Sequence, residues 1–214
     1  MSVTTNYEQS LLEQARQLGM STLFEASGIS TSSVDSNIRT VWQGASIAGP
    51  AYPLECSPGD NLSIHIAMER VPRGSVLVVS TGGFVSGYWG EVLTVAAEAA
   101  GVVGLVIDGG VRDIAALIAR SFPVFTRAIS MRGTIKASSP SVGKAISFAG
   151  TPVHVGDLVV ADDDGVLVLP SEHASRTISD GQTRADKETK MMNKLREGRS
   201  TLELMGLTSW REAR

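Results

Sequence analysis

Two charged residues, Arg112 and Asp113, end an apolar segment and could act together on an anionic substrate. The planar guanidinium of an arginine can pair with a carboxylate or a developing oxyanion through two hydrogen bonds. An aspartate carboxylate is a hard oxygen ligand that suits Mg²⁺ or Mn²⁺. Each residue also has an ordinary interpretation, because a surface arginine is usually solvated and an aspartate before an apolar helix often serves as its N-cap.

A glycine-rich segment from Gly82 to Gly90 precedes a helical pattern that opens with Glu91. The unpaired backbone N–H groups at such a helix start predict a site for a carboxylate or a phosphate. The segment lacks the spacing of a phosphate-binding loop and of a dinucleotide-binding turn, so nucleotide cofactors are not supported. A purely structural turn is the alternative, and Glu91 would be favoured by the helix dipole without any functional role.

The surrounding pattern predicts a parallel sheet. Residues 75–80 and 103–111 are short apolar strands, joined by the glycine-rich loop and a helix over 91–101. A further helix is expected over 113–120 and a third strand at 122–127. Because ligands bind at the carboxyl ends of parallel strands, the two loops would bring Glu91, Arg112 and Asp113 together.

The two ends of the chain look helical, and the second half looks rich in strands. We expect helices over 7–18 and 21–26, the second ended by Gly28, and one or two strands within 40–54. Asp60 is expected to cap a helix that follows it, and the run Asp162 to Asp164 to form a hairpin turn. Strands within 141–170 precede a long charged helix over about 171–197, with an interruption near Gly181.

Composition places the chain among ordinary globular proteins. Its 214 residues are 43% hydrophobic and 19% charged, which predicts one domain with a full-sized core. The net charge of -3 favours neither nucleic acid nor a membrane as partner, and the first residues do not resemble a signal peptide. Cys56 is the only cysteine, and the three histidines lack zinc-ligand spacing. A cytoplasmic location is expected.

Four motifs resemble the class II 4-hydroxy-4-methyl-2-oxoglutarate aldolases and the related RraA-like proteins, regulators of ribonuclease E. They are YWGEVL, GVVGLVIDGGVRD, FPVF and VGDLVVADDDGVLVLP, and the resemblance covers about residues 21–207. The family's aldolases have an acidic residue, twenty others and then Arg-Asp, a spacing that Glu91 and Arg112-Asp113 fit.

The resemblance implies one domain over residues 1–214, with an N-terminal helix at about 1–20 and a C-terminal helical extension at about 171–214. Its fold would be a layered α/β/β/α sandwich similar to the swivelling β/β/α domain of phosphohistidine enzymes. The chain would assemble as a homotrimer or homohexamer.

The resemblance also implies roles for individual residues. Asp113 and Glu91 would hold a divalent metal, Mg²⁺ or Mn²⁺, largely through water, and Arg112 would stabilise an oxyanion. Glu25 and Glu188 would add catalytic carboxylates at the site of a neighbouring subunit. The substrate would be bound by Arg112 and by Gly87, Tyr88, Trp89 and Gly90.

The activity implied is that of a metal-dependent lyase acting on a small oxo-acid. It would release pyruvate by retro-aldol cleavage of 4-hydroxy-4-methyl-2-oxoglutarate-like acids, decarboxylate oxaloacetate, or both, because the two reactions share the enolate of pyruvate. Two alternatives stay open. One is a non-catalytic RraA-like regulator that binds an RNA-decay ribonuclease, and the other is an enzyme of the same fold acting on another oxo-acid or a sugar acid.

Overall fold

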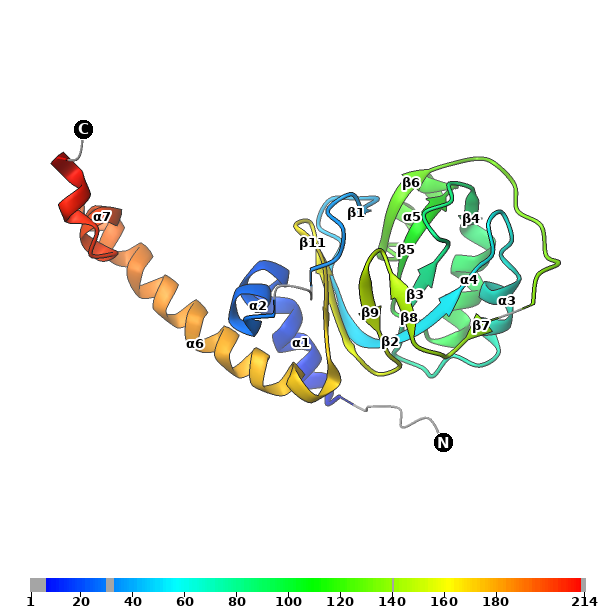
Figure 1. Ribbon diagram of the computed structural model, residues 1–214, viewed down its shortest axis with the longest axis horizontal. Coiled ribbons are helices and arrows are strands. Elements are labelled where there is room, and N and C mark those ends of the chain that lie inside the picture. The colour runs from blue at the N-terminus through cyan, green and yellow to red at the C-terminus, as the bar shows by residue number, and fades with distance from the viewer. Residues whose placement is uncertain (1–6, 30–32, 140, 213–214) are drawn as a thin grey trace.

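Parallel strands of buried apolar residues form the centre of the computed structural model, which describes residues 7–29, 33–139 and 141–212 (Figure 1). Every residue of β3 (Val76–Ser80) and β5 (Gly104–Val111) is buried, as expected for strands covered on both faces. They run parallel to each other, β2 (Ile47–Glu55) runs parallel to β3, and β6 (Val124–Ile129) runs parallel to β5. The predicted parallel sheet is confirmed.

Shorter strands extend this sheet, whose order is β1-β6-β5-β3-β2-β10-β11. β4 pairs with β5 and β7 with β2, while β8 and β9 form a separate hairpin. The bounds are β1 Arg39–Thr40, β4 Gly87–Trp89, β7 Ser141–Val142, β8 Ile146–Phe148, β9 Thr151–Val153, β10 Leu158–Asp162 and β11 Gly165–Leu169. Asp162 pairs with Gly165, so the predicted acidic hairpin turn and the strand-rich second half are both confirmed.

Three clusters of buried residues arrange the elements in layers. On β3, Leu77 and Val79 face a cluster that contains residues of α3 (Leu62–Met68), α4 (Glu91–Ala100) and α5 (Ile114–Ala119). Val76 and Val78 face the opposite way, toward apolar residues of β8 to β11. The outer face of β10 and β11 packs on the helices of the chain ends. The mixed α/β class is confirmed, and the likeness to the swivelling domain stays a prediction.

The helices of the chain ends pack together and extend into an arm on the left of Figure 1. They are α1 (Gln9–Leu18), α2 (Met20–Ser27), α6 (Ser171–Arg196) and α7 (Thr201–Leu204), followed by a 3₁₀ helix over Thr208–Glu212. Gly28 ends α2 in the left-handed conformation, as predicted. The predicted interruption near Gly181 is wrong, because α6 continues through it. Gly181 instead allows close packing: a Cβ atom there would lie 3.0 Å from Leu23 Cδ2.

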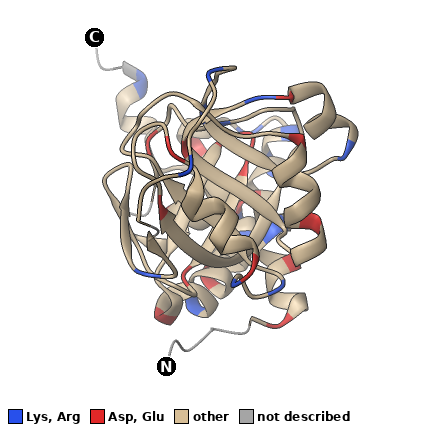
Figure 2. Cartoon of the chain, turned by 90° about the vertical axis from the view of Figure 1, so that its right-hand side faces the viewer, with Lys and Arg blue, Asp and Glu red and all other residues tan. Residues whose placement is uncertain are grey.

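Acidic and basic residues are interspersed over the side of the molecule in Figure 2. None of the helices within the described residues has the length and apolar character needed to cross a membrane.

Asp60 stabilises the start of α3 but does not occupy the N-cap position that the sequence predicted. Asn61 occupies it. The Asp60 carboxylate accepts hydrogen bonds from the backbone N–H groups of Leu62 at 2.8 Å, Ala137 at 2.6 Å and Ser138 at 2.8 Å. Burial alone would raise the pKa of Asp60, but these hydrogen bonds outweigh it and lower the pKa to about 2. Asp60 therefore joins the helix start to a loop far along the chain.

Replacing Asp60 by asparagine should lower the melting temperature at pH 7 by roughly 5 °C, because an amide N–H₂ would face backbone donors. The pKa of Asp60 in the folded protein, about 2, lies below its ordinary value of 3.8. The carboxylate therefore stabilises the fold fully at a pH above 3.8, and this stabilisation is lost as the pH falls through 2. The melting difference between wild type and Asp60→Asn, followed by circular dichroism, should therefore shrink below roughly pH 4. A difference that stays constant down to the lowest pH would contradict this assignment.

Candidate active site

A cavity of about 280 Å³ lies where β4 and β5 end and α4 begins. The start of α3 and the loop after β6 complete its walls. Of the residues predicted for the site, Arg112 and Asp113 line this cavity together with Gly87, Tyr88, Trp89 and Gly90. The two loops that were predicted to lie at one edge of the sheet are in contact there.

Asp113 has an unusual backbone conformation and an unusual partner. It lies at the N-cap position of α5 with φ 59°, in the left-handed region that aspartate adopts more readily than most residues. Its side chain makes no capping hydrogen bond to α5. Instead, Oδ2 accepts the N–H of Glu91 at 3.0 Å and so stabilises the start of α4. No partner of Oδ1 is found among the described residues, so this oxygen is available to a ligand.

Gly90 is the reason that the two loops can approach so closely. A Cβ atom at this position would collide with Asp113 Oδ2 and would lie 3.1 Å from Arg112 Cγ. At Gly87, a Cβ atom would lie 2.6 Å from the carbonyl oxygen of Ser130. These two glycines therefore allow the loops around the cavity to pack closely against each other.

The Arg112 side chain is about half exposed and has no close acidic partner within the described part of the chain. Its Nε atom lies 4.0 Å from Asp113 Oδ2, too far for a hydrogen bond. Its backbone N–H donates to the carbonyl oxygen of Trp89 at 2.8 Å, which fixes the main chain against β4. The guanidinium therefore keeps its donors available for an anion in the cavity.

The backbone N–H groups that lack an acceptor in the described part of the chain include those of Val92 and Leu93, which follow the segment Gly87 to Gly90 implied by the family resemblance. The N–H of Gly87 already donates to Arg132 O at 2.7 Å, and that of Tyr88 to Ser86 O at 3.0 Å. Val92 and Leu93 lie in the first turn of α4 and line the cavity, and their N–H groups have no acceptor among the described residues. The positive end of this helix is therefore the feature that favours a bound carboxylate.

The carboxylate of Glu91 lies away from the cavity. Its Oε1 pairs with Arg120 Nη2 at 3.3 Å, and the same arginine also pairs with Glu98 at 3.1 Å. Only the backbone N–H of Glu91 contacts Asp113. A shared metal would require the Glu91 side chain to leave Arg120, so this role stays a prediction.

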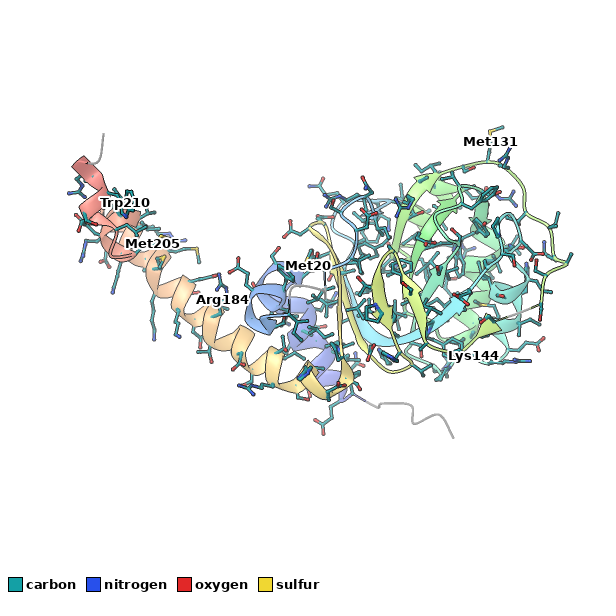
Figure 3. The ribbon with its side chains drawn as sticks, in the orientation of Figure 1. Met20, Met131, Lys144, Arg184, Met205 and Trp210 are labelled. Atoms are coloured by element: carbon teal, nitrogen blue, oxygen red, sulfur yellow. The ribbon has the colours of Figure 1, made fainter. Side chains whose placement is uncertain are left out.

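Glu25 and Glu188 are joined to each other through Arg184 and lie on the helical arm. Figure 3 shows Arg184 on this arm and Met131, in the loop that leads to the cavity, at the far end of the molecule. Within one chain, neither glutamate is near the cavity. Their predicted role at a neighbouring subunit's site stays a prediction.

The donor set fits a hydrated, oxygen-preferring ion. No group of three or more histidine, cysteine, aspartate or glutamate side chains able to hold a metal occurs within the described residues. Mg²⁺ commonly keeps several waters and binds through one or two carboxylates, so a single carboxylate with an open oxygen, as on Asp113, is adequate for it. Zinc, which takes three or four protein ligands, does not fit this arrangement.

Asn61, His65 and Lys136 are among the residues of the cavity wall that were not predicted from the sequence. Asn61 and His65 are four positions apart and lie on one face of α3, a spacing that the sequence contains. Lys136 lies in the loop after β6 and has no ion pair among the described residues. Nothing in the local sequence relates that loop to α3, because Asp60 makes the connection through tertiary hydrogen bonds.

The fold and the cavity together define an α/β protein with a cavity, lined by Arg112 and Asp113, at the carboxyl edge of its parallel strands. The sequence profile of the RraA-like family, described as Aldolase/RraA, matches residues 15–168. The chain belongs to this family.

Individual proteins are similar to this chain in sequence or in structure. A protein of Halalkalibacterium halodurans with the provisional name 4-hydroxy-4-methyl-2-oxoglutarate aldolase is 31% identical over 157 residues, which are 72% of this chain and 75% of the relative. An uncharacterized protein from Pseudomonas syringae has a similar crystal structure, with a TM-score of 0.79, 29% identity and coverage of 94% and 98% of the two chains. RraAS2 of Streptomyces coelicolor, described as an unusual member of the RNase ES inhibitor RraA protein family, has a TM-score of 0.75 at 23% identity over 89% of this chain and all of that chain, a likeness of fold alone.

Proposed function

We propose that this chain is a divalent-metal-dependent carbon–carbon lyase that releases pyruvate from small oxo-acids. The substrates would be 4-hydroxy-4-methyl-2-oxoglutarate-like acids, cleaved by a retro-aldol reaction, and oxaloacetate, which would be decarboxylated. The observation that carries the proposal is the convergence of Arg112, the open carboxylate oxygen of Asp113 and the start of α4 in one cavity. The aldolase name of a relative at 31% identity supports the same class of reaction.

Each group in the cavity has a distinct task in this proposal. The free N–H groups of Val92 and Leu93 bind the substrate carboxylate at the helix start. The Arg112 guanidinium pairs with the oxyanion that develops as the bond breaks. Asp113 would hold Mg²⁺ or Mn²⁺, which, when bound, polarises the 2-oxo group and balances the developing negative charge.

The proposal also requires three carboxylates that lie away from the cavity, those of Glu91, Glu25 and Glu188, to reach the site. Glu91 would reach it by exchanging its ion pair with Arg120 for the metal or its waters. Glu25 and Glu188 would reach it from a neighbouring subunit of a homotrimer or homohexamer. Retro-aldol cleavage also needs a base for the proton of the 4-hydroxyl group, and an acidic side chain would serve.

The proposal is tested by pyruvate release from both acids, measured with a coupled dehydrogenase assay. With Mg²⁺ present, we expect turnover of the hydroxylated acid. Chelation should reduce turnover by about 100-fold or more, and added Mg²⁺ or Mn²⁺ should restore it. Because metal ions decarboxylate oxaloacetate without enzyme, the blank contains metal and heat-inactivated protein. Absence of metal-dependent turnover of any oxo-acid would refute the proposal.

The regulatory branch of the family is the competing interpretation. The fold likeness to RraAS2, at 23% identity, does not extend to binding of a ribonuclease. A regulator also has no need of a cavity that keeps an arginine and a carboxylate oxygen available, so the cavity favours the enzyme. If the assays on oxo-acids and sugar acids were all negative, capture of an RNA-decay ribonuclease by the purified chain would favour the regulator instead.

A further inference from the structure

Arg120 contacts two carboxylates of α4, and one of them belongs to a residue proposed for the metal site. Its Nη2 and Nε atoms lie 3.3 Å and 3.4 Å from Glu91 Oε1, and its Nη1 atom lies 3.1 Å from Glu98 Oε2. Glu91 and Glu98 lie two helical turns apart, so both are on the same side of α4. Arg120 therefore bridges the first and the last turn of this helix.

The two ion pairs of Arg120 are unequal. Its contacts with Glu91 are longer than the usual limit of about 3.2 Å for an N–H···O hydrogen bond, whereas its contact with Glu98 lies within that limit. The three side chains are between 34% and 49% exposed, so water surrounds both pairs and each pair is weak. Glu98 can therefore keep Arg120 in place while the Glu91 carboxylate leaves at a small cost in free energy.

Glu91 is also joined to Asp113, the other residue proposed for the metal site. The backbone N–H of Glu91 donates to Asp113 Oδ2 at 3.0 Å at the start of α4. The half-exposed Glu91 side chain makes its ion pair and hydrogen bonds with Arg120 alone among the described residues. Its carboxylate can therefore turn between Arg120 and a cation held by Asp113.

We propose that Arg120 is a positioning residue that competes with the divalent cation for the Glu91 carboxylate and so lowers the affinity of the site for that cation. This inference rests on the metal site of the proposed function. Pairing with Arg120 and binding of the cation, directly or through water, use the same carboxylate, so each weakens the other. Because such coupling is reciprocal, a bound cation loosens the pair between Arg120 and Glu91 by the same factor.

A purely structural role of Arg120 would have the opposite consequence. Arg120 is the C-cap residue of α5, where the helix dipole favours a positive charge, and its side chain joins α5 to α4. If Arg120 only held these helices together, its loss would loosen the start of α4 and weaken binding of the cation. Competition for Glu91 instead predicts tighter binding when Arg120 is lost.

The test measures binding of Mn²⁺ alone to the metal-free, full-length protein by isothermal titration calorimetry, which needs no substrate. Arg120→Gln should bind Mn²⁺ about threefold to fivefold more tightly than wild type, the upper range for an exposed ion pair. Glu98→Gln should weaken binding about twofold, because Arg120 then pairs with Glu91 alone. Arg176→Gln, exposed on α6 and paired with Asp180, is the matched control and should keep the wild-type affinity.

A double-substitution cycle separates competition for Glu91 from direct repulsion between Arg120 and the cation. In a Glu91→Gln background, competition predicts that Arg120→Gln no longer changes the affinity for Mn²⁺. Direct repulsion would give the same tightening in both backgrounds, and that result would overturn the proposal. Thermal melts show whether each variant folds. If Arg120→Gln does not fold, Glu98→Gln with and without Glu91→Gln completes the same cycle.

The outcomes keep this inference distinct from the lyase proposal. If the wild type binds Mn²⁺ but releases no pyruvate, the lyase fails and the calorimetry still decides the competition. If the wild type is active but Arg120→Gln binds Mn²⁺ no more tightly than wild type, the competition is wrong and the lyase stands. If the wild type binds no Mn²⁺, the competition and the metal dependence of the lyase both fail. Tighter binding that requires Glu91 supports the role of Arg120.

Discussion

Asp113→Asn should lower kcat/KM for pyruvate release on the order of 100-fold, about 2.7 kcal/mol of transition-state stabilisation, while the chain keeps its fold. Asparagine tolerates the left-handed conformation of this position, and its amide oxygen can still accept the N–H of Glu91. The substitution therefore removes the negative charge and little else. The Mg²⁺ concentration that gives half-maximal rate should rise, because a neutral amide is a weaker ligand for a hard cation.

The measurement is a titration of activity with Mg²⁺ for wild type and Asp113→Asn, together with thermal melts. Asp180→Asn is the matched control, because this aspartate is exposed on α6 and pairs only with Arg176 among the described residues. Full activity of Asp113→Asn at low Mg²⁺ would remove Asp113 from the metal site. A large drop in melting temperature would instead show that its charge mainly stabilises the start of α4.

The central sheet was predictable because its signals are local. The apolar runs of β3 and β5, the helix between them and the third strand all follow from residue pattern alone. The prediction failed at Gly181, where glycine indicated a break. Its function there is to admit Leu23 of α2, a contact across more than 150 positions that no local pattern encodes. The four-layer order was expected only from the family resemblance, because strand patterns do not specify how sheets stack.

The site was predictable to the extent that topology determines it. Parallel strands bring their carboxyl ends to one edge, and this rule placed Arg112 and Asp113 beside the glycine-rich segment. Side-chain direction was not predictable. Glu91 has the spacing of a metal ligand, yet Arg120, distant in sequence, holds its carboxylate away from the cavity. Asn61 was missed because an asparagine before a helix looks like an ordinary cap, and only the tertiary structure places it in the cavity wall.

Arg112→Lys should lower kcat by about 100-fold with a smaller change in KM, if the guanidinium acts mainly on the transition state. Lysine keeps the positive charge but loses the planar fork, so it cannot pair in the same two-point geometry with a carboxylate or an oxyanion. The Arg112 side chain makes no hydrogen bond to other described residues, and its backbone bond to Trp89 does not depend on the side chain. Folding should therefore be unchanged, as thermal melts would verify.

Chemical rescue separates the guanidinium's own contribution from an indirect effect of the substitution. Arg112→Ala leaves space beside Asp113 that the small guanidinium ion can occupy, so added guanidinium should restore part of kcat, whereas ammonium at the same concentration should not. Arg176→Lys and Arg176→Ala on the exposed face of α6 are the matched controls, and neither should respond. Equal rescue by both cations would mean that the site needs only positive charge. Wild-type kcat in Arg112→Lys would mean that the oxyanion is stabilised elsewhere, with the free N–H groups at the start of α4 as the nearest donors.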